Sequence, residues 1–482
     1  MSPWLYQLIH TRTIDTLHKD MKTDIAIVGA GISGIMTAYF ILKNTNFEVT
    51  MVDAYKVAHG ATGHNAGQLV ADFERELHDI AQEFGIEAAV QAEKAVHGAW
   101  ALLEQVFNEA SLTTPFSTFM GYNGYESLTR LMDELKNNAI RQEAGEPLHQ
   151  IFIADTAPGL ERIPHMYKHL FSVIPHQDIL DLLETDNKAY IAVMSLRKGC
   201  LNSAMFCEEL VGYLLQKYPG RYTLVEHAPI REVVLESDHA VLCAEKHHVV
   251  ADKVILCTNG FAKFKITNNH GSDIDTIFHH QLRGYIGYMA AYVGPLNQQP
   301  NALAYYGERS RKARHNIDEY YDDPYFYLTR RPYELEKKEK HNLICVGGPE
   351  VYLSDTSTYD PRGIYDKQMA AQIEAFIKKT HKHTPKDNLE FRFTWHGLMG
   401  FTQNGIRLIG FEPLNPVLMY NLGCNGVGIL PSIYGGSRIS LLLNGNGGGG
   451  EGGGVAGGDA AGGGVALPVT IFDPRRCGNQ AC

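Results

Sequence analysis

The chain has 482 residues, of which 44% are hydrophobic and 20% are charged, and its formal net charge at pH 7 is -11. A chain of this length and composition can bury a large core, and we expect two or three intertwined domains. The negative balance offers no basic stripe for phosphates, so we expect no nucleic-acid partner, and it favours a cationic substrate.

Apolar runs and cysteines indicate the compartment. No run is long enough to span a membrane, and the N-terminal segment lacks the apolar core of a signal peptide, so we expect no membrane span and a cytoplasmic location. The eight cysteines form no C-x-x-C pair, and several lie in apolar runs. We therefore expect buried free thiols in a reducing compartment. No feature of the sequence indicates the oligomeric state.

The first strong motif is "DIAIVGAGISG" at residues 24–34, followed by a helical pattern and by "FEVTMVD" at 47–53. Gly29 permits a tight turn, Gly31 lets the backbone approach a pyrophosphate, and Gly34 lets the helix pack closely on the strand. The helix N-terminus favours phosphate binding, and Asp53 at the end of the second strand suits a ribose hydroxyl. Together these features predict a βαβ unit that binds a dinucleotide.

The remaining pattern predicts helices within residues 74–110 and strands at 247–260, 280–293, 324–332 and 342–350. The strand at 247–260 becomes wholly apolar, as expected of a buried parallel strand, whereas the later three are typical of antiparallel strands. Residues 445–464 are rich in glycine and predict a flexible segment, so we expect the ordered body to end near Leu443. The apolar "VTIF" at 469–472 is a candidate for a short strand that docks back.

Two segments resemble one known family. They are "AYKVAHGATGHNAGQL", directly after Asp53, and residues 391–443, which contain "TWHGLMGF" and "GCNGVGIL". Both are similar to the D-amino-acid oxidase-like family of FAD-dependent oxidoreductases, and within it the N-terminal segment most resembles the gamma-glutamylputrescine oxidases. The resemblance extends over most of residues 20–443. It implies an α/β fold in which a FAD-binding Rossmann-type domain, like that of glutathione reductase, is interleaved with an antiparallel-sheet substrate domain.

The implied domain parts alternate along the chain. We expect FAD-binding parts at 20–110, 196–265 and 391–443, substrate-domain parts at 111–195 and 266–390, and a Gly-rich tail at 444–482.

The resemblance also implies that the cofactor is FAD. The residues expected to contact it are Gly29, Gly31, Ser33, Gly34, Asp53, Ala61, Thr62, His64, Asn65, Ala66, Gly67, Gln68, Ile230, Thr258, Gly260, Gly397, Gly423, Gly426, Gly428 and Ile429.

The implied reaction is oxidation of a small-molecule amine. A hydride passes from the C–H bond next to nitrogen to flavin N5, and the resulting imine is hydrolysed. No acid or base stands out in the sequence, so the catalytic residues are unknown. Three alternatives stay open: an oxidase or dehydrogenase of D-amino acids or N-methyl amino acids, a flavin dehydrogenase of a non-amine donor, and a non-catalytic FAD-binding protein.

The substrate residues are less clearly indicated. Some members of the family hold the substrate carboxylate with a basic residue seven positions after the first glycine of the last motif, and Leu430 stands there in this chain. The aromatic and acidic stretch at 315–329, with Tyr325 and Tyr327, favours an amine with a second cationic or polar end. The plainer interpretation of this stretch is a solvated loop followed by a core strand. Arg283 is a candidate for binding a carboxylate, although a surface salt bridge is the commoner role for such a residue.

His64 stands where the gamma-glutamylputrescine oxidases usually have arginine. More distant members of the family bond a histidine near this place covalently to flavin. A neutral imidazole can do so and arginine cannot, but we favour a non-covalent neighbour of the flavin. We expect no metal site, because the pairs His247–His248 and His279–His280 lie in strand-like runs where neighbouring side chains point to opposite faces.

Overall fold

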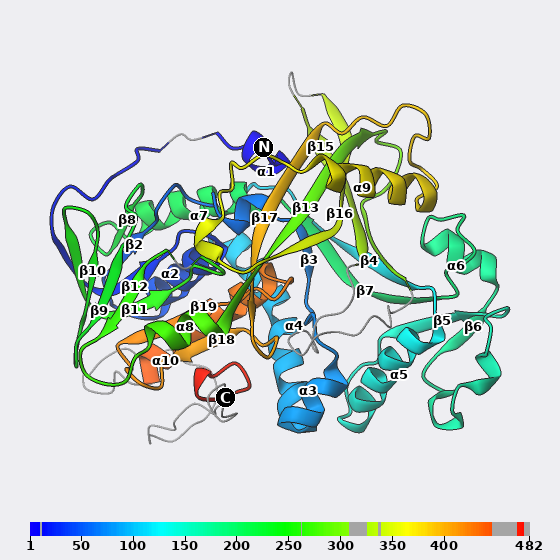
Figure 1. The fold of residues 1–482 in the computed structure, drawn as a ribbon, viewed down its shortest axis with the longest axis horizontal. Helices are drawn as coiled ribbons and strands as arrows, with labels where there is room; N and C mark the ends of the chain where they lie inside the picture. Colours follow the sequence, from blue (N-terminus) through cyan, green and yellow to red (C-terminus); the bar gives the residue numbers. More distant parts are fainter. Residues whose placement is uncertain (10–11, 262, 308–324, 336–338, 446–469, 477–482) are drawn as a thin grey trace.

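The computed structural model describes residues 1–9, 12–261, 263–307, 325–335, 339–445 and 470–476. Two large sheets dominate these residues, one with nine strands and one with ten. In Figure 1 the nine-stranded sheet lies on the left, and the ten-stranded sheet crosses the centre and continues to the right. The α/β fold expected from the sequence is confirmed.

The nine-stranded sheet has the order β12-β9-β10-β11-β1-β2-β8, and β19 also pairs with β11 and with β18. Its strands are β1 (Met21–Val28), β2 (Val49–Val52), β8 (Tyr222–Val225), β9 (Glu232–Leu235), β10 (Ala240–Cys243), β11 (His248–Leu256), β12 (Lys265–Asn268), β18 (Leu408–Phe411) and β19 (Leu418–Leu422). β1 runs parallel to both β2 and β11. The predicted βαβ unit and the buried parallel strand at 247–260 are therefore both present.

Helices pack on one face of this sheet. Strand β1 is apolar on both faces, so the opposite face must be covered as well. Ile25 and Ile27 belong to a core cluster shared with helices α2 (Ile32–Asn44), α7 (Ser203–Lys217) and α10 (Ile429–Gly445). Ala26 and Val28 belong to a second cluster on the opposite face, with side chains from β9 to β12. This alternation along one strand places the glycine turn, which follows Val28, at the edge of a layer that is packed on both faces.

The ten-stranded sheet has the order β17-β13-β16-β15-β14-β4-β7-β5-β6, with β3 paired to β7. Its strands are β3 (Gln68–Val70), β4 (Phe116–Tyr125), β5 (Gln150–Ala154), β6 (Ser172–Ile174), β7 (Ala192–Leu201), β13 (Leu282–Gly294), β14 (Asn301–Tyr306), β15 (Phe326–Glu334), β16 (Lys340–Leu353) and β17 (Phe393–Thr402). The strands predicted near 280–293, 324–332 and 342–350 are β13, β15 and β16, and they pair antiparallel.

The strands change from one sheet to the other as often as the expected parts alternate, but two of these changes come later along the chain than expected. β7 continues through the expected boundary at 195, and β17, within the part at 391–443, pairs with β13 of the ten-stranded sheet. Both crossings bring residues of the two sheets together around one space.

Two local expectations are refined by the structure. The helical region at 74–110 is divided into α3 (Leu77–Phe84) and α4 (Ile86–Glu109), because Gly85 between them has φ +88°. The expected docking strand at 469–472 is wrong in type. Ile471 and Phe472 are buried, but they form a turn before a short 3-10 helix (Pro474–Arg476), and the carbonyl of Phe472 accepts a hydrogen bond from Ile409 N at 2.8 Å. Most of the Gly-rich segment lies outside the described residues.

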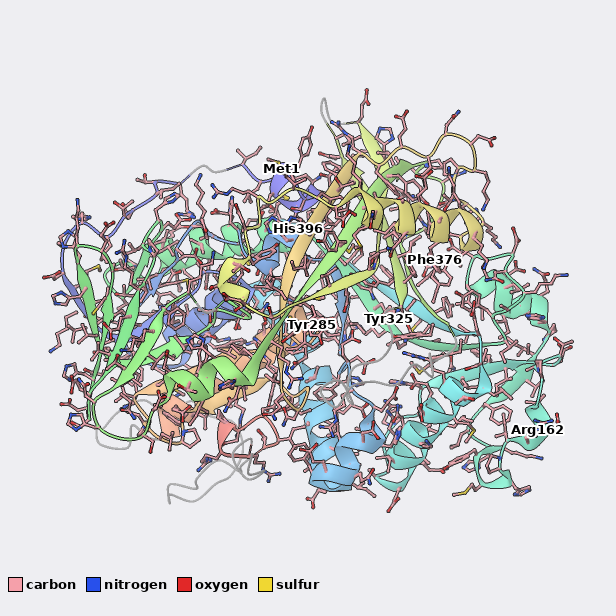
Figure 2. All side chains as sticks on the ribbon, in the orientation of Figure 1. Met1, Arg162, Tyr285, Tyr325, Phe376 and His396 are labelled. Carbon is pink, nitrogen blue, oxygen red and sulfur yellow. The ribbon has the colours of Figure 1, made fainter. Side chains whose placement is uncertain are left out.

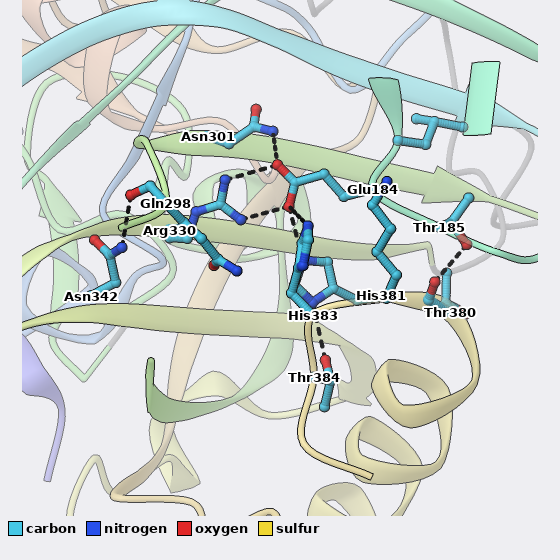
Figure 3. Close-up of polar contacts among 12 residues, drawn as sticks. Glu184, Thr185, Gln298, Asn301, Arg330, Asn342, Thr380, His381, His383 and Thr384 are labelled. Carbon is cyan, nitrogen blue, oxygen red and sulfur yellow. Dashed lines mark hydrogen bonds and ion pairs between the residues drawn. The ribbon is translucent and has the colours of Figure 1, made fainter. Parts of the chain in front are cut away.

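An ionic cluster around Glu184 ties strands β14 and β15 of the ten-stranded sheet together (Figure 3). Glu184 accepts hydrogen bonds from Arg330 of β15 at 2.5 Å and from Asn301 of β14 at 2.8 Å, and its Oε2 lies 3.1 Å from Nε2 of His381 after α9 (Lys367–Thr380). Burial alone would raise the pKa of Glu184, but the hydrogen bonds from Arg330 and His381 lower it well below its usual range. The carboxylate therefore stays ionised and fixes this end of the sheet.

Two further observations concern the cysteines and the length of the helices. The six described cysteines are all free, and four of them are buried. Among the helices that the structure describes, none is long and apolar enough to cross a lipid bilayer.

Candidate active site

A cavity of about 510 Å³ is lined by residues of both sheets. This volume falls within the usual range for cofactor and ligand sites. Its walls come from the turn after β1, the end of β2, residues 59–70, the segment after β11, strands β13, β15, β16 and β17, and the loop before α10.

Two of the three glycines of the first turn show the local geometry that their spacing indicates, and the third, Gly31, lines the cavity. Gly29 has φ +108°, and a Cβ there would lie 2.7 Å from the carbonyl oxygen of Cys257. Gly34 does not line the cavity; a Cβ on it would lie 1.9 Å from the carbonyl oxygen of Gly29, so only glycine lets α2 pack on the turn. Gly31 and Ser33 do line the cavity, at the N-terminus of α2. That position suits an anionic group.

Asp53 lies directly after β2, and its carboxylate is oriented by the main chain. Oδ2 accepts a hydrogen bond from Ala30 N at 2.7 Å, and Oδ1 accepts one from Tyr55 N at 2.8 Å. Burial raises the pKa of Asp53 to about 6, against the opposing effect of these two hydrogen bonds. Each carboxylate oxygen keeps acceptor capacity toward the cavity, as a ribose hydroxyl requires.

The turn after Asp53 forms the middle of the cavity. Of its predicted residues, the lining ones are Ala61, Thr62, His64, Asn65, Ala66 and Gln68. Gly67 is not among them: it has φ +62°, and a Cβ there would lie 2.6 Å from the guanidinium of Arg331, which fixes the turn from behind. His64 Nδ1 lies 2.8 Å from the carbonyl oxygen of Gly60, and burial lowers the pKa of His64 to about 4. The ring is therefore neutral at physiological pH, with Nδ1 protonated.

The C-terminal residues approach the same space. The lining ones are Gly397, Gly426, Gly428 and Ile429, together with Ile230 and Thr258 from the nine-stranded sheet side. Gly423 and Gly260 do not line the cavity. Gly423 has φ +83° and turns the chain after β19, and a Cβ on Gly260 would lie 3.0 Å from the Cα of Gly400. Both glycines therefore shape the wall without forming it.

Arg407 lines the cavity and was missed by the sequence analysis. It is 5% exposed and donates hydrogen bonds to Ser33 Oγ at 3.0 Å and to Asn421 Oδ1 at 2.9 Å. No carboxylate of the described residues pairs with it. Burial lowers its pKa to about 10, which still leaves the guanidinium charged at neutral pH. The signal in the sequence is a lone arginine inside the apolar run "GIRLIGF", because a buried charge needs a partner.

Two of the three predicted substrate residues line the cavity and the third does not. Tyr325 and Tyr327 line the cavity, whereas Arg283 of β13 does not, so the structure gives it no place in this site. Figure 2 shows Tyr325 near the centre of the molecule. Residues 315–324 of the aromatic and acidic stretch lie outside the described residues. Leu430 is fully buried in the core and leaves no basic group at that position.

Two carboxylates beside these tyrosines were also missed. Glu74 Oε1 accepts a hydrogen bond from the Tyr325 hydroxyl at 2.9 Å, and Glu350 on β16 lines the cavity near Tyr327. We call Glu74, Tyr325, Tyr327 and Glu350 the acidic wall. The signal for Glu350 is the "GGPE" sequence within a strand, where glycine and proline indicate a bulge.

The histidine pairs differ from expectation. His279 and His280 lie in helix α8 (Asp275–Gln281), not in a strand. Nδ1 of His247 and Nδ1 of His248 both lie near one oxygen of Asp20, at 3.5 and 3.1 Å, because His247 precedes the regular part of β11. Within the described ranges, no group of three or more His, Cys, Asp or Glu side chains is placed to hold a metal ion.

The residues present fit an anionic dinucleotide. Thr258 Oγ1 is buried without a hydrogen-bond partner among the described residues, and Arg407 is a buried cation without a described anionic partner. Both line the same cavity as the glycine turn and Asp53. A ligand with two phosphates and several hydrogen-bonding groups would satisfy them.

Comparison with known proteins agrees with this geometry. Residues 24–440 match the family model described as FAD-dependent oxidoreductase, DAO. The chain is 33% identical over 75 residues to gamma-glutamylputrescine oxidoreductase of Escherichia coli strain K12, a match that covers 16% of this chain and 17% of that relative's length.

Solved structures share the fold at low identity. Glycine oxidase from Geobacillus kaustophilus is 14% identical with a TM-score of 0.61, covering 88% of this chain and 94% of its own. L-proline dehydrogenase from P. horikoshii is 14% identical with a TM-score of 0.62, covering 89% and 94%. The family match spans most of the residues that build the cavity. The chain therefore belongs to the DAO family of FAD-dependent oxidoreductases, and its cofactor is FAD.

Proposed function

We propose that this oxidoreductase oxidises an amine at the C–H bond next to nitrogen, giving an imine that water hydrolyses to a carbonyl compound and an amine. When bound, FAD supplies the hydride acceptor, at N5. The chain supplies the rest: it binds the amine, orients the C–H bond and keeps bulk water away during the transfer.

The observation that carries this proposal is the acidic wall. Its two carboxylates and two tyrosine rings suit an ammonium group, which binds both to carboxylates and to aromatic faces. A free α-amino acid would need a basic partner for its carboxylate. Leu430 is buried and Arg283 lies outside the cavity, so neither provides one. These facts favour an amine over a small α-amino acid.

We also propose how the chain holds FAD. Asp53 accepts hydrogen bonds from the adenosine ribose, while Ser33, the N-terminus of α2 and Arg407 contact the pyrophosphate. Residues 61–68 and Gly397 lie beside the flavin ring. The support is that Asp53, Ser33, Arg407, Gly397 and most of residues 61–68 line one cavity.

The test is anaerobic mixing of the purified, FAD-loaded protein with a panel of primary and secondary amines, α-amino acids and 2-hydroxy acids, while the flavin absorbance band is followed. We expect bleaching by amines and none by 2-hydroxy acids. Faster bleaching by alanine, proline or sarcosine than by putrescine derivatives would contradict the proposed substrate class. Bleaching by a hydroxy acid alone would contradict amine oxidation itself.

A further inference from the structure

A bulge in β16 gives Glu350 its orientation. The pairing of β13 with β16 shifts register between Gly287 and Met289, which face Glu350 and Gly347 respectively. Gly348 within the bulge has φ +159°, and a Cβ there would lie 2.6 Å from the ring of Phe326. Bulges of this kind commonly redirect a side chain beside an active site.

Glu350 ends a row of residues that crosses three neighbouring strands. Gly397 of β17 pairs with Gly287 of β13, which in turn pairs with Glu350 of β16. Directly paired residues present their side chains on the same face, and all three line the cavity. The two glycines add no side chain, and in their place the row is bordered by the main chain of His64 over Gly397 and by the flexible end of the Met399 side chain over Gly287, as far as Glu350.

The next row supplies the rings beside this opening. Met289 pairs with Gly347, and Gly347 pairs with Tyr327. A Cβ on Gly347 would lie 2.3 Å from Met289 Sδ and 2.4 Å from Tyr327 Cζ, so glycine makes the space in which the Tyr327 ring lies. The Tyr325 ring lies 5.8 Å from the Tyr327 ring between centroids and is anchored to Glu74.

The Glu350 carboxyl has no hydrogen bond or ion pair among the described residues. It is exposed to the space of the cavity, but the protein that encloses the cavity limits its solvation and raises the pKa of Glu350 to about 7. An acid in such a place is stabilised in its ionised form by a cation that binds beside it.

We propose that Glu350 binds the second, non-reacting ammonium group of a diamine substrate, with Tyr325 and Tyr327 as the aromatic wall beside the aliphatic spacer. This inference rests on the proposed amine oxidation. Strands lie about 4.8 Å apart, so the Cα atom of Glu350 is about 10 Å from that of Gly397. A short aliphatic spacer can then link a reacting nitrogen near the His64 turn to the Glu350 carboxylate.

The test compares 1,4-diaminobutane with butylamine, which have the same chain length and differ by one ammonium group. Dissociation constants are measured from the perturbation of the flavin spectrum of the full-length holoenzyme, and reduction is measured separately. We expect the wild type to bind the diamine about tenfold or more tightly than the monoamine. Glu350→Gln should remove this preference by weakening the diamine alone. The matched control is Glu161→Gln, because Glu161 is exposed and adjoins Arg162, which lies at the far edge of the molecule in Figure 2.

A second variant keeps the inference testable if Glu350→Gln folds poorly. Glu350→Asp retains the charge but shortens the side chain by one methylene group, so the preferred ligand should become 1,5-diaminopentane. A preference for the diamine that survives Glu350→Gln, or no preference in the wild type, would overturn the inference. If no amine bleaches the flavin but diamine binding still depends on Glu350, amine oxidation fails and the ammonium site stands.

Discussion

The two ends of the cavity differ in charge. At the N-terminus of α2 the cation is Arg407, which donates hydrogen bonds to Asn421 and Ser33, and the Asp53 carboxylate is bonded to the main chain of the same turn. At the acidic wall the charges are Glu74 and Glu350 beside two tyrosine rings. FAD brings two phosphate charges and an amine brings a positive one, so each end is complementary to a different ligand. One continuous cavity can therefore orient cofactor and substrate by charge.

Gly34→Ala should have the largest effect, because the added methyl group would clash with the main chain of the glycine turn. A Cβ at this position would lie 1.9 Å from a main-chain oxygen that cannot move without opening the turn. We expect a loss of about 3 kcal/mol or more in the free energy of unfolding, together with loss of FAD binding. Thermal unfolding and the flavin content of the purified protein measure both effects.

Gly98→Ala is the matched control for that change. Gly98 lies within α4, and a Cβ there meets no atom within 4 Å. Alanine should stabilise the helix by about 0.5 to 1 kcal/mol and leave flavin content unchanged. Equal behaviour of the two variants would show that close packing at Gly34 is not needed.

Arg407→Gln tests the charge at the nucleotide end. We expect about 10- to 100-fold weaker FAD binding, since hydrogen bonds between charged partners contribute about 1.5 to 3 kcal/mol. Riboflavin, which has no phosphate, should bind with unchanged affinity, and Arg362→Gln at an exposed position should change neither. Titration by flavin fluorescence measures the affinity of each of the two variants for FAD and for riboflavin. Equal weakening of riboflavin and FAD would mean that Arg407 supports the wall rather than the phosphates.

Sequence reasoning was most successful for the glycine turn and the segment that follows it, where the residues that line the cavity are close together in sequence. The glycine turn, Asp53 and the turn at 61–68 lie within about forty residues of one another, and each residue type has a backbone or hydrogen-bonding task that local spacing reveals. The order of strand, helix and strand followed from apolar periodicity for the same reason.

Arg407, Glu74 and Glu350 could not be found in that way, because their roles depend on partners distant in sequence. Arg407 is placed at the N-terminus of α2 by a hydrogen bond to Ser33, which is distant in sequence. Glu350 is placed in the cavity by the strand register that aligns it with Gly287 and Gly397. For Arg283 the predicted strand is present, but the position of the residue along β13 places it outside the cavity. The sequence alone does not fix that position relative to the other strands.

Glu350 also predicts a pH dependence at the acidic wall. With its pKa raised to about 7, the carboxyl is neutral below that pH and ionised above it. The affinity for 1,4-diaminobutane should therefore rise about tenfold between pH 6 and pH 7.5 and then level off. Tyr327, whose pKa is raised, and His64, whose pKa is lowered to about 4, do not change charge in this range.

Butylamine and Glu350→Gln provide the controls for this profile. Neither the monoamine with the wild type nor the diamine with the variant should show the step near pH 7. A step that persists in Glu350→Gln would assign the titration to another group, with Lys198 and Asp72 as the first residues to replace, because burial shifts the pKa of Lys198 to about 7 and that of Asp72 to about 8.

His64 lies between the two ends, and its substitution should have the smallest effect. The ring is neutral, with Nδ1 donating to the Gly60 carbonyl and Nε2 left as an acceptor. One main-chain hydrogen bond orients the ring, whereas covalent attack on the flavin requires a closely fixed geometry. We expect acid denaturation to release all the flavin into the supernatant, and His64→Gln to weaken FAD binding less than about tenfold. Yellow colour that stays with the precipitate, and is lost in His64→Gln, would instead show a covalent bond at His64.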